Sequence, residues 1–243
     1  MTDGPDWQAV IDACWPPART ERAGPWTLRI SPGAGGRVNA ISGDRDAALH
    51  APATLDRAEA AARANGQRPS FVVWPDQPEL DAALAARGYR VEDAVHLYEI
   101  AVADVAQGVM PYATAFTIWP PLQIMRDIWA EGGIGPARQA VMARAARPAG
   151  ILARVDDRAA GVGFVAAHGP VALLSAVEVL ARHRRKGVAR NILRAAAHWA
   201  RDQGCTRLAL VTTRDNLPAN SAYASSGMRN VGGYHYRRHP DPA

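Results

Sequence analysis

The strongest chemical signal in the sequence is a basic stretch, RHRRKGVARNILR, at residues 182–194. Arginines and a lysine stand directly before Gly187, and an apolar helical pattern begins directly after it. The first turn of a helix leaves backbone N–H groups without partners and carries partial positive charge, so it attracts phosphate. Glycine allows a ligand to approach the backbone closely. The stretch therefore predicts a phosphate or pyrophosphate site, with a solvated basic loop before an ordinary helix as the alternative.

A predicted strand and a predicted helix position this basic stretch. The strand covers 171–181, directly before the stretch, and the helix begins within it and covers 188–204, with Gly204 at its end. A further strand, RLALVTT, is expected at 207–213. Upstream, we expect two helices and then two strands, at 120–133, 136–148, 151–157 and 160–167.

Two stretches of the sequence can be laid over each other, which indicates an internal duplication. They cover residues 68–100 and 206–237, and the glycines that align, Gly88 and Gly227, are 139 positions apart. Each stretch has a β-type run, a polar turn with proline, an Ala-rich helical segment and a second strand-like run. We therefore expect two domains, at 1–105 and 112–243, with ADVAQGVMP interrupting the periodicity between them.

Length and composition agree with a two-domain globular protein. The chain has 243 residues, of which 48% are hydrophobic and 21% charged. No apolar run approaches the ~18 to 20 residues of a membrane span, and the N-terminus has no signal-peptide pattern, so we expect a cytoplasmic protein without membrane contact. Cys14 and Cys205 match no metal or redox spacing, so no metal is expected.

The charge is unevenly distributed along the chain. Residues 1–110 hold 10 Arg and 15 Asp or Glu, whereas residues 111–243 hold 18 Lys or Arg and 8 Asp or Glu, so the halves carry −5 and +10. A basic half is compatible with nucleic-acid binding. However, Arg supplies 27 of the 28 basic residues and is scattered, so we expect no nucleic-acid partner.

The basic loop resembles the pyrophosphate loop of the GCN5-related N-acetyltransferase (GNAT) superfamily, whose pattern is Arg/Gln-x-x-Gly-x-Gly/Ala. Arg184, Gly187 and Ala189 fill this pattern, and Val179 stands in the usual valine place. Downstream, NLPANSAYASSGM is similar to the family's second signature, Asn-x-x-Ala-x-x-x-Tyr-x-x-x-Gly-Phe. The matching residues there are Asn216, Ala219, Tyr223 and Gly227, with Met228 replacing the aromatic residue.

The resemblance covers residues 112–238, and the first half resembles a second, degenerate copy. It implies an α/β (α+β) protein with two tandem GNAT-like domains, each a mixed, mostly antiparallel central sheet flanked by helices. It also implies an N-acyltransferase in which an amine attacks acetyl-CoA, or another acyl-CoA, directly in a ternary complex. The donor would lie where the strand at 171–181 splays from the strand at 207–213. The implied cofactor-binding residues are Val177, Val179, Arg184, Arg185, Lys186, Gly187, Val188, Ala189 and Asn216.

Two residues are candidates for moving protons. Tyr223 matches the family's general acid, with a core tyrosine as the alternative. Glu178 is the only carboxylate on the central strand and is the candidate base, with a strand-edge salt bridge as the alternative. Some relatives carry a glutamate on the next strand, where this sequence has Val211. We expect His183 to contact ligand or solvent and His168 to be a turn residue.

The first half is expected to bind no acetyl-CoA. Aligning Gly88 with Gly227 puts Leu84 where Tyr223 stands and Gln77 where Asn216 stands. The nearest glycine-rich candidate, GAGGRVNAIS, runs into a β-type pattern and offers no helix N-terminus to a phosphate. We therefore expect this half to be a structural partner.

The acceptor is expected to be a small-molecule amine or a peptide. Segments 119–138 and 228–240 are expected to form its pocket, and the strand-like YHYRR at 234–238 would border it. A homodimer is left open. Two other functions compete with the enzyme: a CoA-binding sensor or scaffold without catalysis, and a nucleic-acid-binding protein.

Overall fold

The computed structural model describes residues 4–45, 47–110 and 113–241 of the protein. The chain forms two compact units, and neither is continuous in sequence. Unit 1 contains the chain up to Pro16, Tyr98–Val211 and Asn216–Val231. Unit 2 contains Pro17–Leu97, Thr212–Asp215 and the chain from Gly232 onward. These units differ from the expected ranges 1–105 and 112–243; residues 111 and 112, at that boundary, lie outside the described part of the chain.

Unit 1 is built on a seven-stranded sheet with the order β12-β6-β11-β10-β9-β8-β7. Its strands are β6 (Val95–Ala101), β7 (Ala115–Ile118), β8 (Pro148–Val155), β9 (Arg158–His168), β10 (Val171–Val179), β11 (Arg207–Thr213) and β12 (Arg229–Gly232). The strands from β7 to β10 pair antiparallel, whereas β10 and β11 are parallel. The strands expected from β-type runs are confirmed, and β7 is an addition.

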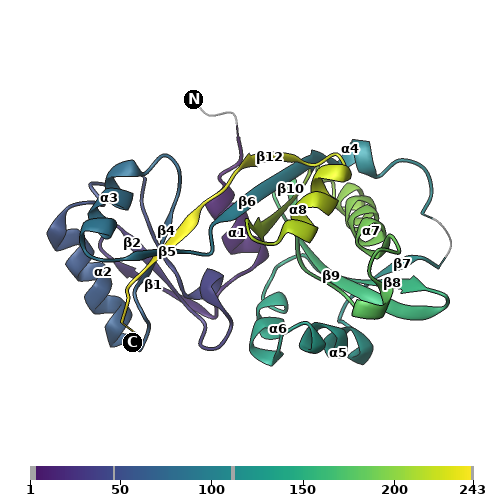
Figure 1. Ribbon diagram of the computed structural model, residues 1–243, viewed down its shortest axis with the longest axis horizontal. Coiled ribbons are helices and arrows are strands. Elements are labelled where there is room, and N and C mark those ends of the chain that lie inside the picture. Colours follow the sequence, from purple (N-terminus) through teal and green to yellow (C-terminus); the bar gives the residue numbers. More distant parts are fainter. Residues whose placement is uncertain (1–3, 46, 111–112, 242–243) are drawn as a thin grey trace. The chain divides into compact units, whose positions relative to one another are not determined.

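Helices cover both faces of this sheet (Figure 1). They are α1 (Trp7–Cys14), α4 (Val102–Val105), α5 (Gln123–Glu131), α6 (Pro136–Met142), α7 (Val188–Asp202) and α8 (Leu217–Ser225). Helix α7 packs on one face through a buried stripe at Val188, Ile192, Ala196 and Ala200, spaced four residues apart. Helices α5 and α6 lie on the other face (Figure 1).

Unit 2 has a six-stranded sheet with the order β1-β2-β3-β4-β13-β5. Its strands are β1 (Arg19–Ala23), β2 (Trp26–Ile30), β3 (Ile41–Gly43), β4 (Ser70–Val73), β5 (Arg90–Glu92) and β13 (His235–Arg238). Its helices are α2 (Pro52–Ala64) and α3 (Pro78–Ala86). Trp26, Leu55, Phe71 and Leu84 are fully buried and form the centre of its core. Both sheets are mixed and flanked by helices, as the fold-class prediction requires.

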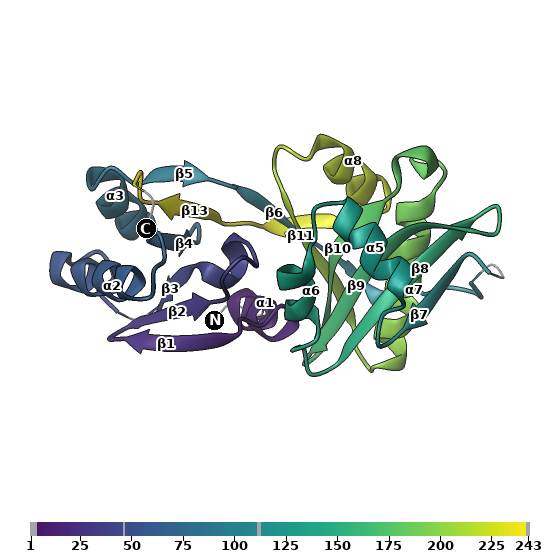
Figure 2. The same ribbon diagram turned by 90° about the horizontal axis from the view of Figure 1, so that it is seen from below.

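The two copies of the duplication exchange their last strands. Each copy runs strand, helix, strand, strand: β4-α3-β5-β6 in the first and β11-α8-β12-β13 in the second. Strand β13 lies between β4 and β5, antiparallel to both (Figure 2). Strand β6 correspondingly lies between β11 and β12. The exchange is why the compact units depart from the expected ranges, and it places the strand at 234–238 in the sheet of unit 2.

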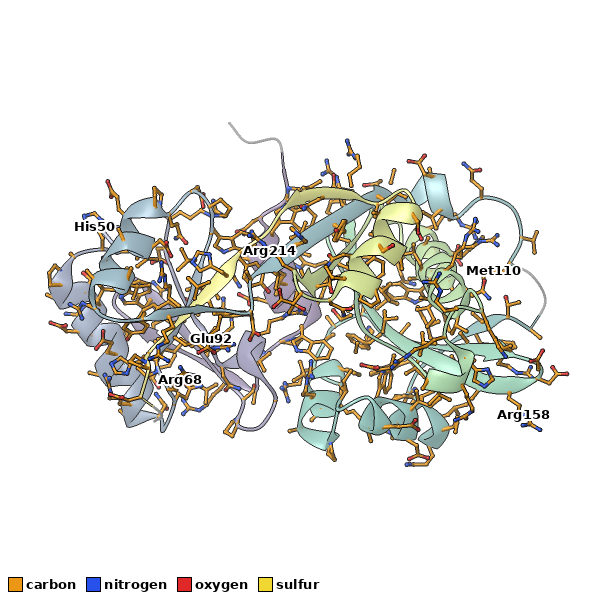
Figure 3. All side chains as sticks on the ribbon, viewed as in Figure 1. His50, Arg68, Glu92, Met110, Arg158 and Arg214 are labelled. Atoms are coloured by element: carbon orange, nitrogen blue, oxygen red, sulfur yellow. The ribbon has the colours of Figure 1, made fainter. Side chains whose placement is uncertain are left out.

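Charged side chains hold β13 in its place. Arg237 donates two hydrogen bonds to Asp81 of α3, at 2.7 and 2.9 Å. This pairing, together with a contact from His235, lowers the pKa of Asp81 to about 2. On the neighbouring strand β5, Glu92 accepts hydrogen bonds from Arg238 and from Arg68. Figure 3 shows Arg68 and Glu92 side by side.

Candidate active site

The candidate site is built around an irregularity in β10. Strand β10 pairs with β11 only over 171–174 and 207–210, and both strands continue beyond that point. On its other side, Ser175 pairs with Phe164 but Glu178 pairs with Val162, so the register shifts by one residue. Ala176, inside this bulge, has φ 51°. Bulges re-aim side chains, and this one sets the direction of Glu178.

Helix α5 fixes the bulge from the neighbouring face. The indole nitrogen of the fully buried Trp129 donates a 2.8 Å hydrogen bond to the carbonyl oxygen of Ala176. The turn after α5 then reaches Glu178, because a Cβ on Gly132 would lie 2.5 Å from the Glu178 Oε2 atom. Only glycine at 132 leaves room for the carboxyl group in this position.

The Glu178 carboxyl group is half-buried and lies in a partly apolar environment. Burial raises its pKa above the ordinary glutamate value, and Arg184 and Arg138 partly oppose that rise. The charges that act on Glu178 come from Arg184 and Arg138. A carboxyl group with a raised pKa is suited to accept a proton.

Tyr223 lies on α8 and is 9% exposed. Burial, and to a lesser degree the charge of Glu178, raise its pKa to about 12. The electrostatic effect means that the two candidate proton carriers share one environment, although they are 45 positions apart in the sequence. With that pKa the phenol keeps its proton throughout the neutral range.

The basic loop connects β10 to α7 through a short 3-10 turn, η2 (Ala181–His183). Gly187 is the N-cap residue of α7 with φ 76°, and a Cβ there would meet no protein atom within 4 Å. No side chain caps α7, and its first turn holds no acidic residue. Helices α1 and α8 are capped by Asp6 and Asn216, whereas α2, α3, α5 and α6 resemble α7 in having no side-chain cap. The first turn of α7 is therefore exposed to an incoming anion.

Two glycines of β9 bring α7 close to the bulge. A Cβ on Gly161 would lie 2.7 Å from the carbonyl oxygen of Glu178, and a Cβ on Gly163 would lie 2.7 Å from Ile192 of α7. Glycine within a strand often marks such an approach of another backbone or helix. The glycines in AGVGFV and in EGGIGP, which holds Gly132, were thus signals of close approach by another part of the chain, and the sequence analysis did not use them.

The other predicted residues have distinct places. Val177 and Val179 are half-buried against the core of unit 1, and Val188 is buried under the helix start. Arg184, Arg185 and Lys186 are exposed, and Arg184 donates to the Val179 carbonyl at 3.3 Å. His183 was expected to contact ligand or solvent; it is 6% exposed, so the solvent contact is not formed, and the ligand contact stays a prediction.

Comparison with known proteins finds a family match over this part of the chain. Residues 119–228, which include α5, α6, the bulge, the loop and α8, match the Acetyltransferase (GNAT) family. Both GNAT signatures found in the sequence lie within or at the end of the matched range.

Solved structures extend the likeness of fold over almost the whole chain. A GCN5-related N-acetyltransferase from Kribbella flavida has a TM-score of 0.75 at 17% identity, covering 96% of this chain and 94% of that one. A tandem GNAT protein from the clavulanic acid biosynthesis pathway has a TM-score of 0.62 at 16% identity, covering 96% and 86%. The tandem arrangement is thus a known form of this fold.

Curated relatives match shorter segments. An aminoglycoside N(6')-acetyltransferase type 1 from Klebsiella aerogenes is 34% identical over 98 residues, which is 36% of this chain and 64% of that protein. The chain therefore spans less than two thirds of the length of this GNAT relative. Among the described residues, no helix is long and apolar enough to cross a membrane, and no three His, Cys, Asp or Glu side chains group as metal ligands would.

Proposed function

We propose that unit 1 is an N-acyltransferase that transfers an acetyl group from acetyl-CoA to an amine of a small molecule or peptide. The observation that carries the proposal is the uncapped start of α7 at Gly187, directly downstream of the strand that holds Glu178. A pyrophosphate fits this helix end, because its N–H groups and the exposed Arg184, Arg185 and Lys186 are all donors.

Val177, Val179 and Asn216 would contact the pantetheine arm, which runs from the basic loop to the reacting thioester. Strands β10 and β11 pair with each other only over 171–174 and 207–210, and the pantetheine arm would lie beyond that point, along Val177 and Val179 of β10, with Asn216 at the start of α8 beside it. Acetyl-CoA supplies the activated thioester. The amine attacks it directly in a ternary complex, without a covalent enzyme intermediate.

Two protons must move in this reaction. Glu178 takes a proton from the attacking amine, because its raised pKa makes it a stronger base than an ordinary carboxylate. Tyr223 protonates the departing sulfur, because it still holds its proton at neutral pH. The turn at Gly132 touches Glu178, so the acceptor amine enters beside the α5–α6 segment.

The loop assignment is tested by calorimetry with acetyl-CoA on Gly187→Asp, which puts a carboxylate where the pyrophosphate would lie. We expect affinity to fall at least tenfold, by about 1.4 kcal/mol or more. Gly204→Asp is the matched control, because Gly204 also has φ 76° and open space around it but lies at the other end of α7. Equal affinity in both variants would remove the loop from the site.

The activity itself is tested by acetyl-CoA consumption over a panel of amines, amino acids, aminoglycosides and peptides. Turnover with at least one amine, lost on adding a competing CoA analogue, is the expected result. Tight acetyl-CoA binding without turnover over the whole panel would favour a sensor or scaffold instead.

A further inference from the structure

One side chain of the exchanged strand β6 reaches the helix that carries Tyr223. Tyr98 is 7% exposed, and its hydroxyl donates a 3.1 Å hydrogen bond to the Oδ1 atom of Asn220 on α8. Its ring lies 6.2 Å from the ring of Tyr223, at an angle of 49°. A residue of the first copy therefore contacts the signature helix of the second copy within unit 1.

A chain of hydrogen bonds continues from Tyr98 to Asn216. The Nδ2 atom of Asn220 donates to the carbonyl oxygen of Asn216 at 2.9 Å. The Oδ1 atom of Asn216 in turn accepts from the backbone N–H of Ala219 and caps α8. One hydroxyl from β6 thus braces the first turn of α8, and one ring from β6 packs near the phenol of Tyr223.

The same pair of positions makes a contact in unit 2, with different chemistry. The offset of 139 relates Tyr98 to Arg237 and Asn220 to Asp81. There Arg237 and Asp81 form a two-point ion pair, which ties β13 to a helix that carries Leu84 in place of Tyr223. In unit 1 the contact is neutral, so it adds no charge near Tyr223 and leaves its raised pKa undisturbed.

We propose that Tyr98, contributed by the first copy, is a positioning residue for the acetyl-transfer site of the second copy. The inference rests on the proposed function of unit 1. The hydroxyl of Tyr98 holds Asn216 against the donor, and the ring holds Tyr223 in the orientation for proton transfer. The first copy thereby contributes to the site although it lacks the motifs to form one.

The test compares Tyr98→Phe, which keeps the ring, with Tyr98→Leu, which removes it. Losing one neutral hydrogen bond changes an equilibrium about threefold to tenfold. We therefore expect Tyr98→Phe to weaken acetyl-CoA binding by about that factor in calorimetry while kcat changes little. Tyr98→Leu should lower kcat as well, because the Tyr223 ring loses its neighbour.

A double-mutant cycle with Asn220→Ala shows whether the effect travels through the hydrogen-bond chain. We expect Tyr98→Phe to have no further effect on acetyl-CoA affinity once Asn220 is alanine. Arg237→Gln is the matched structural control, because it breaks the equivalent contact in unit 2. It should lower the thermal midpoint and leave acetyl-CoA affinity unchanged.

The outcomes separate the two proposals. If the wild type binds acetyl-CoA and both Tyr98 variants match it in affinity and kcat while losing thermal stability, Tyr98 is structural and the inference is wrong. If the wild type does not bind acetyl-CoA, the proposed function fails and this inference fails with it. Additive effects in the cycle would also overturn the link through Asn220.

Discussion

At the scale of single residues, burial has different consequences for the two proposed proton carriers, Glu178 and Tyr223. Burial disfavours the charged form of an acid, so it raises the pKa of both Glu178 and Tyr223. For the tyrosine the rise to about 12 secures its proton, whereas for the glutamate the rise brings the pKa closer to neutrality. These opposite consequences are what the proposed acid and base roles require.

Replacing Tyr223 by phenylalanine tests the acid. The ring would still pack beside Tyr98, so folding and acetyl-CoA binding should be nearly intact. We expect kcat to fall by about 10²-fold, within the usual range for loss of a general acid. Steady-state kinetics with a good acceptor measures this change, and an unchanged kcat would reduce Tyr223 to a packing residue.

Replacing Gly132 by alanine tests the base. The added Cβ would collide with the Glu178 carboxyl group and displace it toward water. A base works only when it is deprotonated, so kcat/KM decreases when the pH drops below the pKa of the base. Because the pKa of Glu178 is raised, this decrease, the acidic limb of the pH profile, should occur at a higher pH than for an ordinary glutamate. In Gly132→Ala the limb should move to lower pH and kcat/KM should drop.

The control for this prediction lies three residues along the same turn. Gly135 has open space around it and an ordinary φ of −73°, so Gly135→Ala changes the turn without touching Glu178. The pH profile of kcat/KM for each variant decides the matter. If both profiles coincide with that of the wild type, Glu178 does not act as the base.

At the scale of elements, the bulge in β10 depends on its bond to α5. In Trp129→Phe the partly buried carbonyl of Ala176 loses its donor, and losing such a hydrogen bond costs about 0.5–1.5 kcal/mol. We expect a lower free energy of unfolding and a lower kcat, because the bulge directs Glu178. Denaturant unfolding and kinetics measure both, with Trp199→Phe on the half-buried side of α7 as the control. Lost stability with full activity would show that the bulge does not need Trp129.

At the scale of the whole molecule, the duplication has produced two units, and the candidate acetyl-CoA site lies in unit 1 alone among the described residues. In unit 2, Leu84 is fully buried at the position of Tyr223, and the Gln77 side chain accepts from the backbone of Trp74. The GAGGRVNAIS segment ends in β3, preceded by a four-residue 3-10 turn, rather than in a long helix. We expect titration calorimetry to give one acetyl-CoA per chain, and a stoichiometry of two would make the first copy a working site.

The sequence by itself determined the local elements and the loop. Helix α7 follows from its apolar spacing and from Gly204, and the strands from their β-type runs, because these signals lie within a few residues of each other. The proposed phosphate loop could be recognised for the same reason: its cations, its glycine and its helix are contiguous in the chain. Tyr223 and Glu178 were found through a resemblance and through a charge in an apolar run.

Only the tertiary structure decided which distant residues meet. Strand pairing depends on partners far along the chain, so no local pattern indicated that β6 and β13 change sheets. The contact of Tyr98 with Asn220, on which its proposed role rests, follows from that exchange. The bond from Trp129 to the bulge and the contact of Gly132 with Glu178 likewise join residues 47 and 46 positions apart. Such contacts are set by packing between elements, which the period of a single element does not encode.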